Sequence, residues 1–367
     1  MRTNGLLTFI ALLFLIGCAE RKYVVIETDN PPFYENTAFN SFEDLRSPKF
    51  ERLKTKYQLD TVLRGEEDEF RRILLLRNWI KDVIKIDDFG DPYPGGGTVE
   101  GILDEALQGT GFHCGHYMKV QNGIMNAYGY VTRVLGAGPG EKGGRDGHHG
   151  VNEIWSNTFQ KWFLSDAKYN HHFEKNGIPL SALEIREEYL KNKTADVVVV
   201  KGPHREVIQV DPETRDTKEE FAQTYTWLEY FTNSDLFTKG DDHEFLLTVY
   251  EDDYFKNNTW IWDGKPHWAY DKPEFMIREP SRHAIEWTPN TIRSAVDISG
   301  GKARINLESQ TPNFREYQMK AGKSGNWQAV KSPVALPLEE KAYDLTFRAV
   351  NLAGVTGPEH TIKIRRE

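Results

Sequence analysis

The segment from Phe112 to Gly136 constrains the fold most, because its pattern changes from helix to strand just after a single cysteine. After Cys114, apolar side chains recur at steps of three and four residues, which predicts one helical face with Gln121 as its polar exception; they are Tyr117, Val120, Ile124, Met125 and Tyr128. Gly129 ends the helix, and residues 130–135 alternate as in a strand rich in β-branched side chains. We therefore expect a helix that begins at Cys114 and leads directly into a strand.

A cysteine at the start of a helix has the geometry of a nucleophile. The N–H groups of the first turn and the positive end of the helix dipole both favour a thiolate over a thiol. The alternative is an inert cysteine that packs as a small apolar group. Glycines at 109 and 111 and the neighbours His113 and His116 are poor surroundings for such a residue. The two histidines themselves are interpreted as polar loop and first-turn residues.

The second cysteine, Cys18, has a different context. Residues 1–18 contain an early basic residue, Arg2, an apolar run from Leu6 to Ile16, and the ending Leu15-Ile16-Gly17-Cys18. The run is too short to span a bilayer permanently and is typical of an export signal. Its ending resembles a bacterial lipobox, which implies lipidation of Cys18 and membrane anchoring in the cell envelope, at an outer membrane or cell surface. An ordinary signal peptide that ends near a cysteine is the alternative.

Composition narrows the class of protein. Lys and Arg number 46 against 55 Asp and Glu, for a net charge of -9, so the basic surface of a nucleic-acid-binding protein is not indicated. The apolar content of 39% is that of a globular protein. With Cys18 lipidated, Cys114 has no partner for a disulfide, and an exported chain with a single free thiol suggests that the thiol is used.

The chain divides into five predicted parts. They are a signal peptide (1–18), a tether and docking segment (19–64), a core (65–200), an aromatic-rich β extension (201–287) and a β-sandwich (288–367). In the core, residues 66–82 and 182–191 have helical spacing. The strand-like pattern of residues 151–155 and 162–165 predicts two strands joined by a turn.

A second chemical group lies at this predicted strand pair. His148 and His149 precede the first strand, and Asp166 follows the second. Two adjacent antiparallel strands would bring a histidine and the aspartate together beside the start of the Cys114 helix. The chain therefore carries, in the order Cys, His, Asp, the three kinds of side chain that can serve as a thiol nucleophile, its base and an orienting carboxylate.

The ordered set of motifs resembles the transglutaminase-like superfamily. The residues that match are Cys114-Gly115, Gly129 with Arg133, His149 with Asn152, Glu153 and Trp155, and Trp162 with Asp166, together with upstream Arg77, Trp79 and Ile80. The similar region runs from about Glu66 to Asn170, less than half of the chain. It implies an α+β papain-like core in which the cysteine helix packs on an antiparallel sheet.

The resemblance also implies roles for individual residues. Cys114 would be the nucleophile, His149 the general base and later acid, and Asp166 the carboxylate that fixes the imidazole tautomer. His148 is the alternative base. His148, Trp155 and Trp162 are predicted to contact substrate, and the Cys114 N–H to stabilise an oxyanion. A second oxyanion donor has no candidate in the sequence. Asn152 and Glu153 are either supports for the site or ordinary strand residues.

Two kinds of metal site are alternatives to this interpretation. A zinc site could use Cys114 with the histidines at 113, 116, 148 or 149, but paired cysteines are lacking and Asp166 is left unused. The acidic residues near 241–242 and 251–253 lack the glycine and spacing of an EF-hand. We expect no metal and no cofactor. Trp260 and Trp262 are predicted to be core residues, with sugar stacking as the alternative.

The C-terminal part has short alternating apolar runs separated by turn signals, as in an antiparallel sandwich. Tyr343 resembles the tyrosine corner of fibronectin type III-like domains, and Trp327 is predicted to be core. The complete sequence hypothesis is an exported, membrane-anchored thiol hydrolase acting on amide or acyl bonds of a protein, peptide or glycopeptide. A protein crosslinker and an inactive scaffold that binds peptide or glycan are the alternatives.

Overall fold

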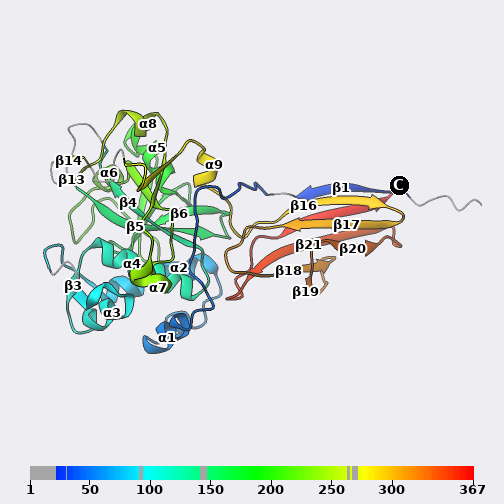
Figure 1. Ribbon diagram of the computed structural model, residues 1–367, viewed down its shortest axis with the longest axis horizontal. Coiled ribbons are helices and arrows are strands. Elements are labelled where there is room, and N and C mark those ends of the chain that lie inside the picture. The colour runs from blue at the N-terminus through cyan, green and yellow to red at the C-terminus, as the bar shows by residue number, and fades with distance from the viewer. Residues whose placement is uncertain (1–21, 30, 91–93, 141–146, 263–264, 267–271) are drawn as a thin grey trace, which may run out of the picture.

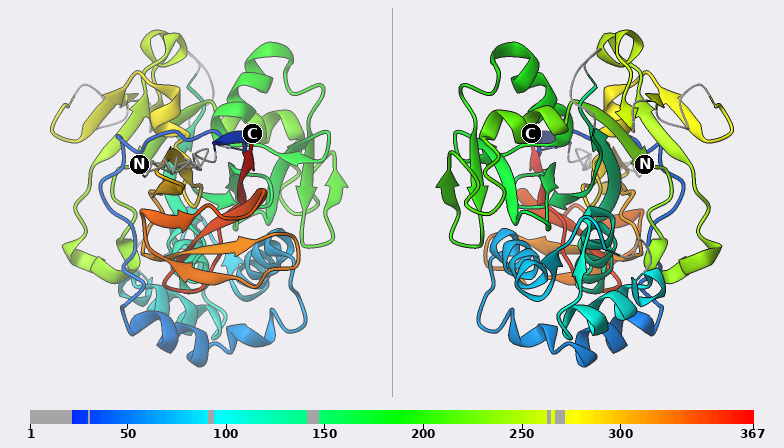
Figure 2. Two further views of the ribbon diagram at one scale, coloured as in Figure 1. Left: turned by 90° about the vertical axis from the view of Figure 1, so that its right-hand side faces the viewer. Right: turned by 90° about the vertical axis from the view of Figure 1, so that its left-hand side faces the viewer.

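The computed structural model describes residues 22–29, 31–90, 94–140, 147–262, 265–266 and 272–367. It is a mixed α/β protein of elongated shape, with helices and sheets at one end and an all-β unit at the other (Figure 1). Figure 2 shows the two ends along the long axis, with the all-β unit nearest the viewer in the left view. Cys18, the predicted lipidation site, lies outside the described residues. In the part of the chain that is described, no helix is long and apolar enough to cross a membrane.

A six-stranded sheet is the centre of the larger end. Its order is β15-β12-β11-β4-β5-β6, and its neighbours are antiparallel except for the parallel pair β12 and β15. The strands are β4 (Thr132–Gly138), β5 (His149–Ser156), β6 (Lys161–Ser165), β11 (Trp227–Phe231), β12 (Leu247–Tyr250) and β15 (Met276–Glu279). The strands predicted at 151–155 and 162–165 are confirmed as parts of β5 and β6.

Helix α4 (Cys114–Ala127) lies between this sheet and a layer of helices. It contacts β4 and β5 on one side, and α1, α2, α3 and α7 on the other. These helices are α1 (Lys49–Lys56), α2 (Glu69–Val83), α3 (Val99–Ala106) and α7 (Leu236–Lys239), with short 3₁₀ turns at η1 (Leu59–Thr61), η2 (Pro94–Gly97) and η3 (Gly240–Asp242). Because it is covered on both sides, α4 is buried almost all round, including the polar Gln121 and Asn122. The apolar spacing in the sequence had predicted only one buried face for this helix.

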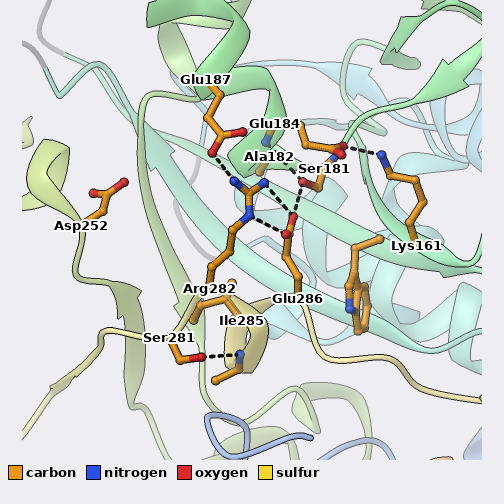
Figure 3. A network of polar contacts seen from close by, with 12 residues as sticks. Lys161, Ser181, Ala182, Glu184, Glu187, Asp252, Ser281, Arg282, Ile285 and Glu286 are labelled. Atoms are coloured by element: carbon orange, nitrogen blue, oxygen red, sulfur yellow. Dashed lines mark hydrogen bonds and ion pairs between the residues drawn. The ribbon is translucent and has the colours of Figure 1, made fainter. Parts of the chain in front are cut away.

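A second sheet and further helices cover the rest of this end. The four-stranded sheet has the order β10-β9-β7-β8, and the additional elements include α5 and α9. The bounds are β7 (His171–Lys175), β8 (Ile178–Pro179), β9 (Val198–Lys201), β10 (Glu206–Ile208), α5 (Ala182–Asn192), α6 (Lys218–Thr224), α8 (Asp253–Asn257), α9 (Arg282–Ile285), β2 (Lys85–Ile86) with β3 (Gly111–Phe112), and β13 (Ile261–Trp262) with β14 (Lys265–Pro266). Figure 3 shows how α9 is tied to α5: Arg282 contacts Glu187 and Glu286, and Ser181 donates to Glu286 at 2.9 Å.

The predicted β extension over 201–287 is corrected by the sheet order. Strands β11, β12 and β15 form half of the central sheet, and the 200/201 boundary would cut β9. Pairing of β11 with β4 carries no local sequence signal, because the two strands are far apart along the chain. Residues 201–287 are therefore part of the fold that forms the site.

Arg133 and Glu153, both from the matched motifs, make a buried ion pair inside the central sheet. Arg133 Nε donates to Glu153 Oε2 at 2.9 Å, and its guanidinium lies over the Trp162 ring at 4.1 Å. Glu153 also accepts from the Ala182 N–H at 2.6 Å, at the start of α5. Glu153 therefore has a structural role. Its carboxylate neutralises the buried Arg133 and also accepts a hydrogen bond from a backbone N–H at the start of α5.

Two sheets enclose one apolar core in the all-β unit. The first has the order β1-β22-β21-β18-β19 and the second β16-β17-β20. The strands are β1 (Tyr23–Asp29), β16 (Arg293–Ser299), β17 (Lys302–Glu308), β18 (Phe314–Ala321), β19 (Gln328–Val330), β20 (Val334–Pro337), β21 (Ala342–Asn351) and β22 (His360–Arg366). The tether and docking segment predicted over 19–64 is corrected here: β1 pairs with β22, whereas residues 49–61 belong to the helical layer at the other end.

Two aromatic residues of this unit were singled out by sequence. The Tyr343 hydroxyl accepts from the Glu340 N–H at 2.8 Å and donates to the Pro337 carbonyl at 3.2 Å, so it fixes the backbone just upstream of its own strand. Trp327, predicted to be core, is half-buried at the surface, with Arg348 and Lys320 over its ring at 4.0 and 4.6 Å. Its indole is covered by cationic side chains instead of apolar ones.

Candidate active site

Cys114 is the first residue of α4, as the spacing predicted, and its side chain is buried. His113 is the N-cap of the helix, and its Nδ1 accepts from the Gly115 N–H at 3.2 Å. The His113 side chain also contributes to lowering the pKa of the Cys114 thiol. The histidine interpreted as a polar loop residue therefore affects both residues that follow it.

His149 and Asp166 meet as the strand pairing predicted. His149 is the first residue of β5, Asp166 directly follows β6, and His149 Nε2 lies 2.6 Å from Asp166 Oδ2. His149 and Cys114 line the same cavity, and each side chain shifts the pKa of the other. Since Nε2 faces the aspartate, Nδ1 is the ring nitrogen left for the sulfur. The structure thus brings Cys114, His149 and Asp166 together in one buried chain of contacts.

Asp166 has further partners that sequence reasoning missed. The Tyr225 hydroxyl donates to Asp166 Oδ2 at 2.7 Å, and His171 Nε2 lies 3.2 Å from that hydroxyl. The backbones of Asp166 and His171 bond to each other at 3.0 and 3.1 Å, and buried Arg77 donates to the His171 carbonyl at 2.9 Å. Arg77 therefore fixes the turn that carries the carboxylate. Tyr225 lies 59 residues from Asp166 and has no distinguishing sequence pattern around it.

The charges of these groups depend on one another. Burial alone would raise the pKa of the Cys114 thiol, but hydrogen bonds from His113 and His149 and the positive charges of His149 and Lys168 lower that pKa well below its usual value. Burial would lower the pKa of His149, yet the charge and hydrogen bond of Asp166 raise it to about 9. Burial would raise the pKa of Asp166, and the contacts with His149, His171 and Tyr225 hold it below its usual range. These shifts favour a thiolate on Cys114, an imidazolium on His149 and a carboxylate on Asp166.

Cys114 and His149 open onto a cavity of about 1020 Å³. Apolar and aromatic side chains make much of its wall, among them Met118, Tyr169, Phe231, Phe245 and Trp260. A neighbouring cavity of about 380 Å³ shares Gly97, Lys119, Phe231 and Phe245 with the first. Cys114 lines only the first of these two cavities.

The two adjacent histidines, His148 and His149, have different surroundings in the structure. His148 is exposed and lines the cavity, and its contact with substrate stays a prediction, whereas His149 is the one bonded to Asp166. Trp260 is buried, as predicted, and also forms part of the cavity wall, where its Nε1 donates to the Gly147 carbonyl at 2.6 Å. The Trp262 side chain lies outside the described residues.

The prediction that Trp155 and Trp162 contact substrate is wrong. Both indoles are buried in the core on β5 and β6, with ring centres 5.9 Å apart. Trp162 Nε1 donates to the Trp287 carbonyl at 2.7 Å, and Trp155 Nε1 to Asn157 at 3.0 Å. They border a separate crevice of about 150 Å³. Because their polar atoms are satisfied within the protein, these tryptophans stabilise the sheet and do not face the Cys114 cavity.

Comparisons with known proteins give little beyond this geometry. No family model matches the chain, and no curated protein matches it. Among solved structures, the crystal structure of red sea bream transglutaminase is similar with a TM-score of 0.25 and 11% sequence identity. The match covers 80% of this chain and 53% of that one, so the chain spans about half the length of the transglutaminase. Over the described residues, no group of three or more His, Cys, Asp or Glu side chains is placed to hold a metal ion.

The substitution Asp166→Asn tests the origin of the charge on the sulfur. Wild-type Cys114 should react with iodoacetamide at a nearly constant rate across neutral pH, slowing in acid as pH falls through the lowered pKa of the thiol. Without the carboxylate the pKa of His149 falls, the imidazolium is lost, and the alkylation rate at neutral pH should drop about tenfold or more, one pKa unit being about 1.4 kcal/mol. Rates are read by mass spectrometry of the Cys114 peptide.

Asp216→Asn is the matched control, because it removes a carboxylate from the wall of the same cavity. It should keep the wild-type rate and pH profile. Equal loss in both variants would show that general cavity charge, and not the contact with His149, activates the thiol.

Proposed function

We propose that this protein is a transglutaminase-like thiol enzyme that cleaves amide or other acyl bonds through an acyl-enzyme intermediate. The observation that carries the proposal is the buried contact series from Cys114 through His149 to Asp166, with His149 Nε2 at 2.6 Å from the carboxylate. A helix that begins at the cysteine and packs on an antiparallel sheet supports a papain-like core.

The chemistry follows from the charges at neutral pH. The Cys114 thiolate adds to the carbonyl carbon of the substrate, and the C=O electron pair becomes an oxyanion near the first turn of α4, where the N–H of Cys114 is the proposed donor. As the C–N or C–O bond breaks, the His149 imidazolium gives its proton to the leaving group. Neutral His149 then takes a proton from water, whose oxygen attacks the thioester and releases a carboxylic acid and the thiolate. Asp166 stays ionised throughout and stabilises each imidazolium.

The shape of the site supports a protein, peptide or glycopeptide substrate. Two adjoining cavities continue from Cys114, and Phe89, beside the first cavity, exposes 99% of its surface. Such an apolar side chain at a cavity edge suits contact with an extended ligand. Hydrolysis is proposed over transfer because water is the default acceptor. The all-β unit is proposed to be a fibronectin type III-like module, supported by its two sheets around one core and by the Tyr343 contacts.

An activated acyl ester tests the reaction. Wild-type protein should release the alcohol in a burst and gain the mass of one acyl group on the Cys114 peptide. Cys114→Ala removes the nucleophile, so acylation should vanish and turnover should fall by about a thousandfold or more. Absence of acylation in wild type, together with peptide or glycan binding that Cys114→Ala leaves intact, would support the scaffold alternative. Incorporation of an added amine into acceptor proteins in place of hydrolysis would support the crosslinker.

Membrane anchoring through Cys18 is a separate proposal, supported by the lipobox-like sequence at the end of the leader. The mature protein would begin at lipidated Cys18 and lie outside the cytoplasm, since two or more acyl chains hold a protein on a membrane stably. Expressed with its leader in a bacterium, wild type should sediment with membranes and carry the lipid mass on its N-terminal peptide. Cys18→Ala should abolish that mass. An unmodified Cys18 in membrane-bound wild type would contradict the proposal.

A further inference from the structure

The imidazole ring of His113 has its proton position set by the first turn of α4. Its Nδ1 accepts the Gly115 N–H at 3.2 Å. A ring nitrogen that accepts a hydrogen bond carries no proton, so the neutral imidazole carries its proton on Nε2. His113 is therefore the N-cap of the helix through one nitrogen and a hydrogen-bond donor through the other.

The residues around this ring hold it in place. A Cβ at position 115 would lie 3.1 Å from His113 Cε1, closer than a side chain normally approaches, so glycine there leaves room for the imidazole. The His116 ring packs against the His113 ring, with ring centres 4.0 Å apart. His116 is buried and packs in turn against Phe112. The backbone turn and the neighbouring ring thus fix where the Nε2–H of His113 lies.

His113 belongs to the wall of the cavity in which the reaction is proposed to occur. It lines that cavity together with Cys114 and His149, and its side chain is only partly buried. His113 precedes α4 whereas His149 begins β5, so the two histidines come to the sulfur from different elements. Against the raising effect of burial, His113 lowers the pKa of the Cys114 thiol, as a hydrogen-bond donor near the sulfur would.

The backbone at the start of α4 has few donors left for an oxyanion. Addition of a thiolate to a carbonyl carbon places negative charge on the oxygen, and N–H groups already in position stabilise that charge better than water does. The Gly115 N–H donates to His113 Nδ1, and the His116 N–H donates to the His113 carbonyl at 3.1 Å. The Cys114 N–H is the donor proposed above, and a side-chain donor beside it would complete a pair.

We propose that His113 donates its Nε2–H to the oxyanion that forms on the substrate carbonyl, as the second donor beside the Cys114 N–H. The inference rests on the proposed function, because it assigns a donor for that reaction. The proton stays on Nε2 throughout, so His113 stabilises charge and transfers no proton, which remains the role of His149. Before the reaction the same N–H faces a thiolate, and formation of the C–S bond moves the negative charge from the sulfur to the oxygen.

The substitution His113→Ser tests this role, because serine is a good N-cap and lacks the ring donor. Rates are compared at a pH where alkylation of each protein by iodoacetamide has reached its plateau, so that all of the sulfur is thiolate. The plateau alkylation rate should stay close to that of wild type, because alkylation forms no oxyanion. Acylation of Cys114 by an activated ester should fall by about a hundredfold or more, as on loss of an oxyanion donor.

The variant His113→Asn is the conservative control, because its amide group can both accept and donate a hydrogen bond. It should retain part of the acylation rate that His113→Ser loses. Acylation of His113→Ser at the wild-type rate would overturn the donor role. An equal loss of alkylation and acylation would also overturn it, because His113 would then act only on the helix and the sulfur.

A binding measurement separates this inference from the proposed reaction. Butanal labelled with ¹³C at its carbonyl carbon adds reversibly to the Cys114 thiolate. A C–S bond forms, the carbonyl electron pair moves to the oxygen, and that oxygen takes a proton from His149. The adduct is measured by NMR, and its oxygen lies where the oxyanion would form. Wild type should therefore bind butanal about fivefold or more tightly than His113→Ser, as expected for one hydrogen bond.

The two measurements fail in different ways. If no ester acylates Cys114 in wild type, the proposed function fails, and the butanal comparison still decides the donor. Equal butanal affinity in wild type and His113→Ser, or no adduct in wild type, would overturn the role of His113, whatever the esters show.

Discussion

The contact between His149 and Asp166 is the interaction on which the site depends. A thiolate buried beside a neutral imidazole would be unfavourable, because burial opposes ionisation of the sulfur. The carboxylate changes this balance by holding a proton on the ring. Its own ionisation is secured by Tyr225 and by the turn that Arg77 fixes. The reactivity of one sulfur is thus an outcome of packing across β5, β6, α2 and α6, and not a property of Cys114 alone.

Local patterns predicted the elements that hold these groups. The helix from Cys114 follows from apolar spacing, and it ends before Gly129, whose φ of +77° is one that glycine adopts freely. Strand alternation predicted β5 and β6, and their pairing brings His149 to Asp166. Each of these features is set within some twenty residues, where side-chain period and turn chemistry act directly. The order Cys, His, Asp could be found for the same reason.

Contacts between distant segments could not be found in this way. β1 pairs with β22 across almost the whole chain, and Tyr225 reaches the site because β11 joins β4. Strand pairing of this kind depends on tertiary packing, for which a single sequence has no periodic signal. The errors on Trp155, Trp162 and Trp327 have a related cause. An aromatic residue in a strand has the same local pattern whether it faces a core, a cavity or the cationic side chains of a surface.

The ionisation of Cys114 at neutral pH is the central claim, and the ultraviolet absorbance of thiolate measures it without any substrate. The difference spectrum between wild type and Cys114→Ser should be recorded over a pH titration of the folded protein. The account predicts one thiolate equivalent at neutral pH that disappears only in the acid range. A thiolate signal that is absent at neutral pH and rises near the ordinary cysteine pKa of about 8.5 would contradict it.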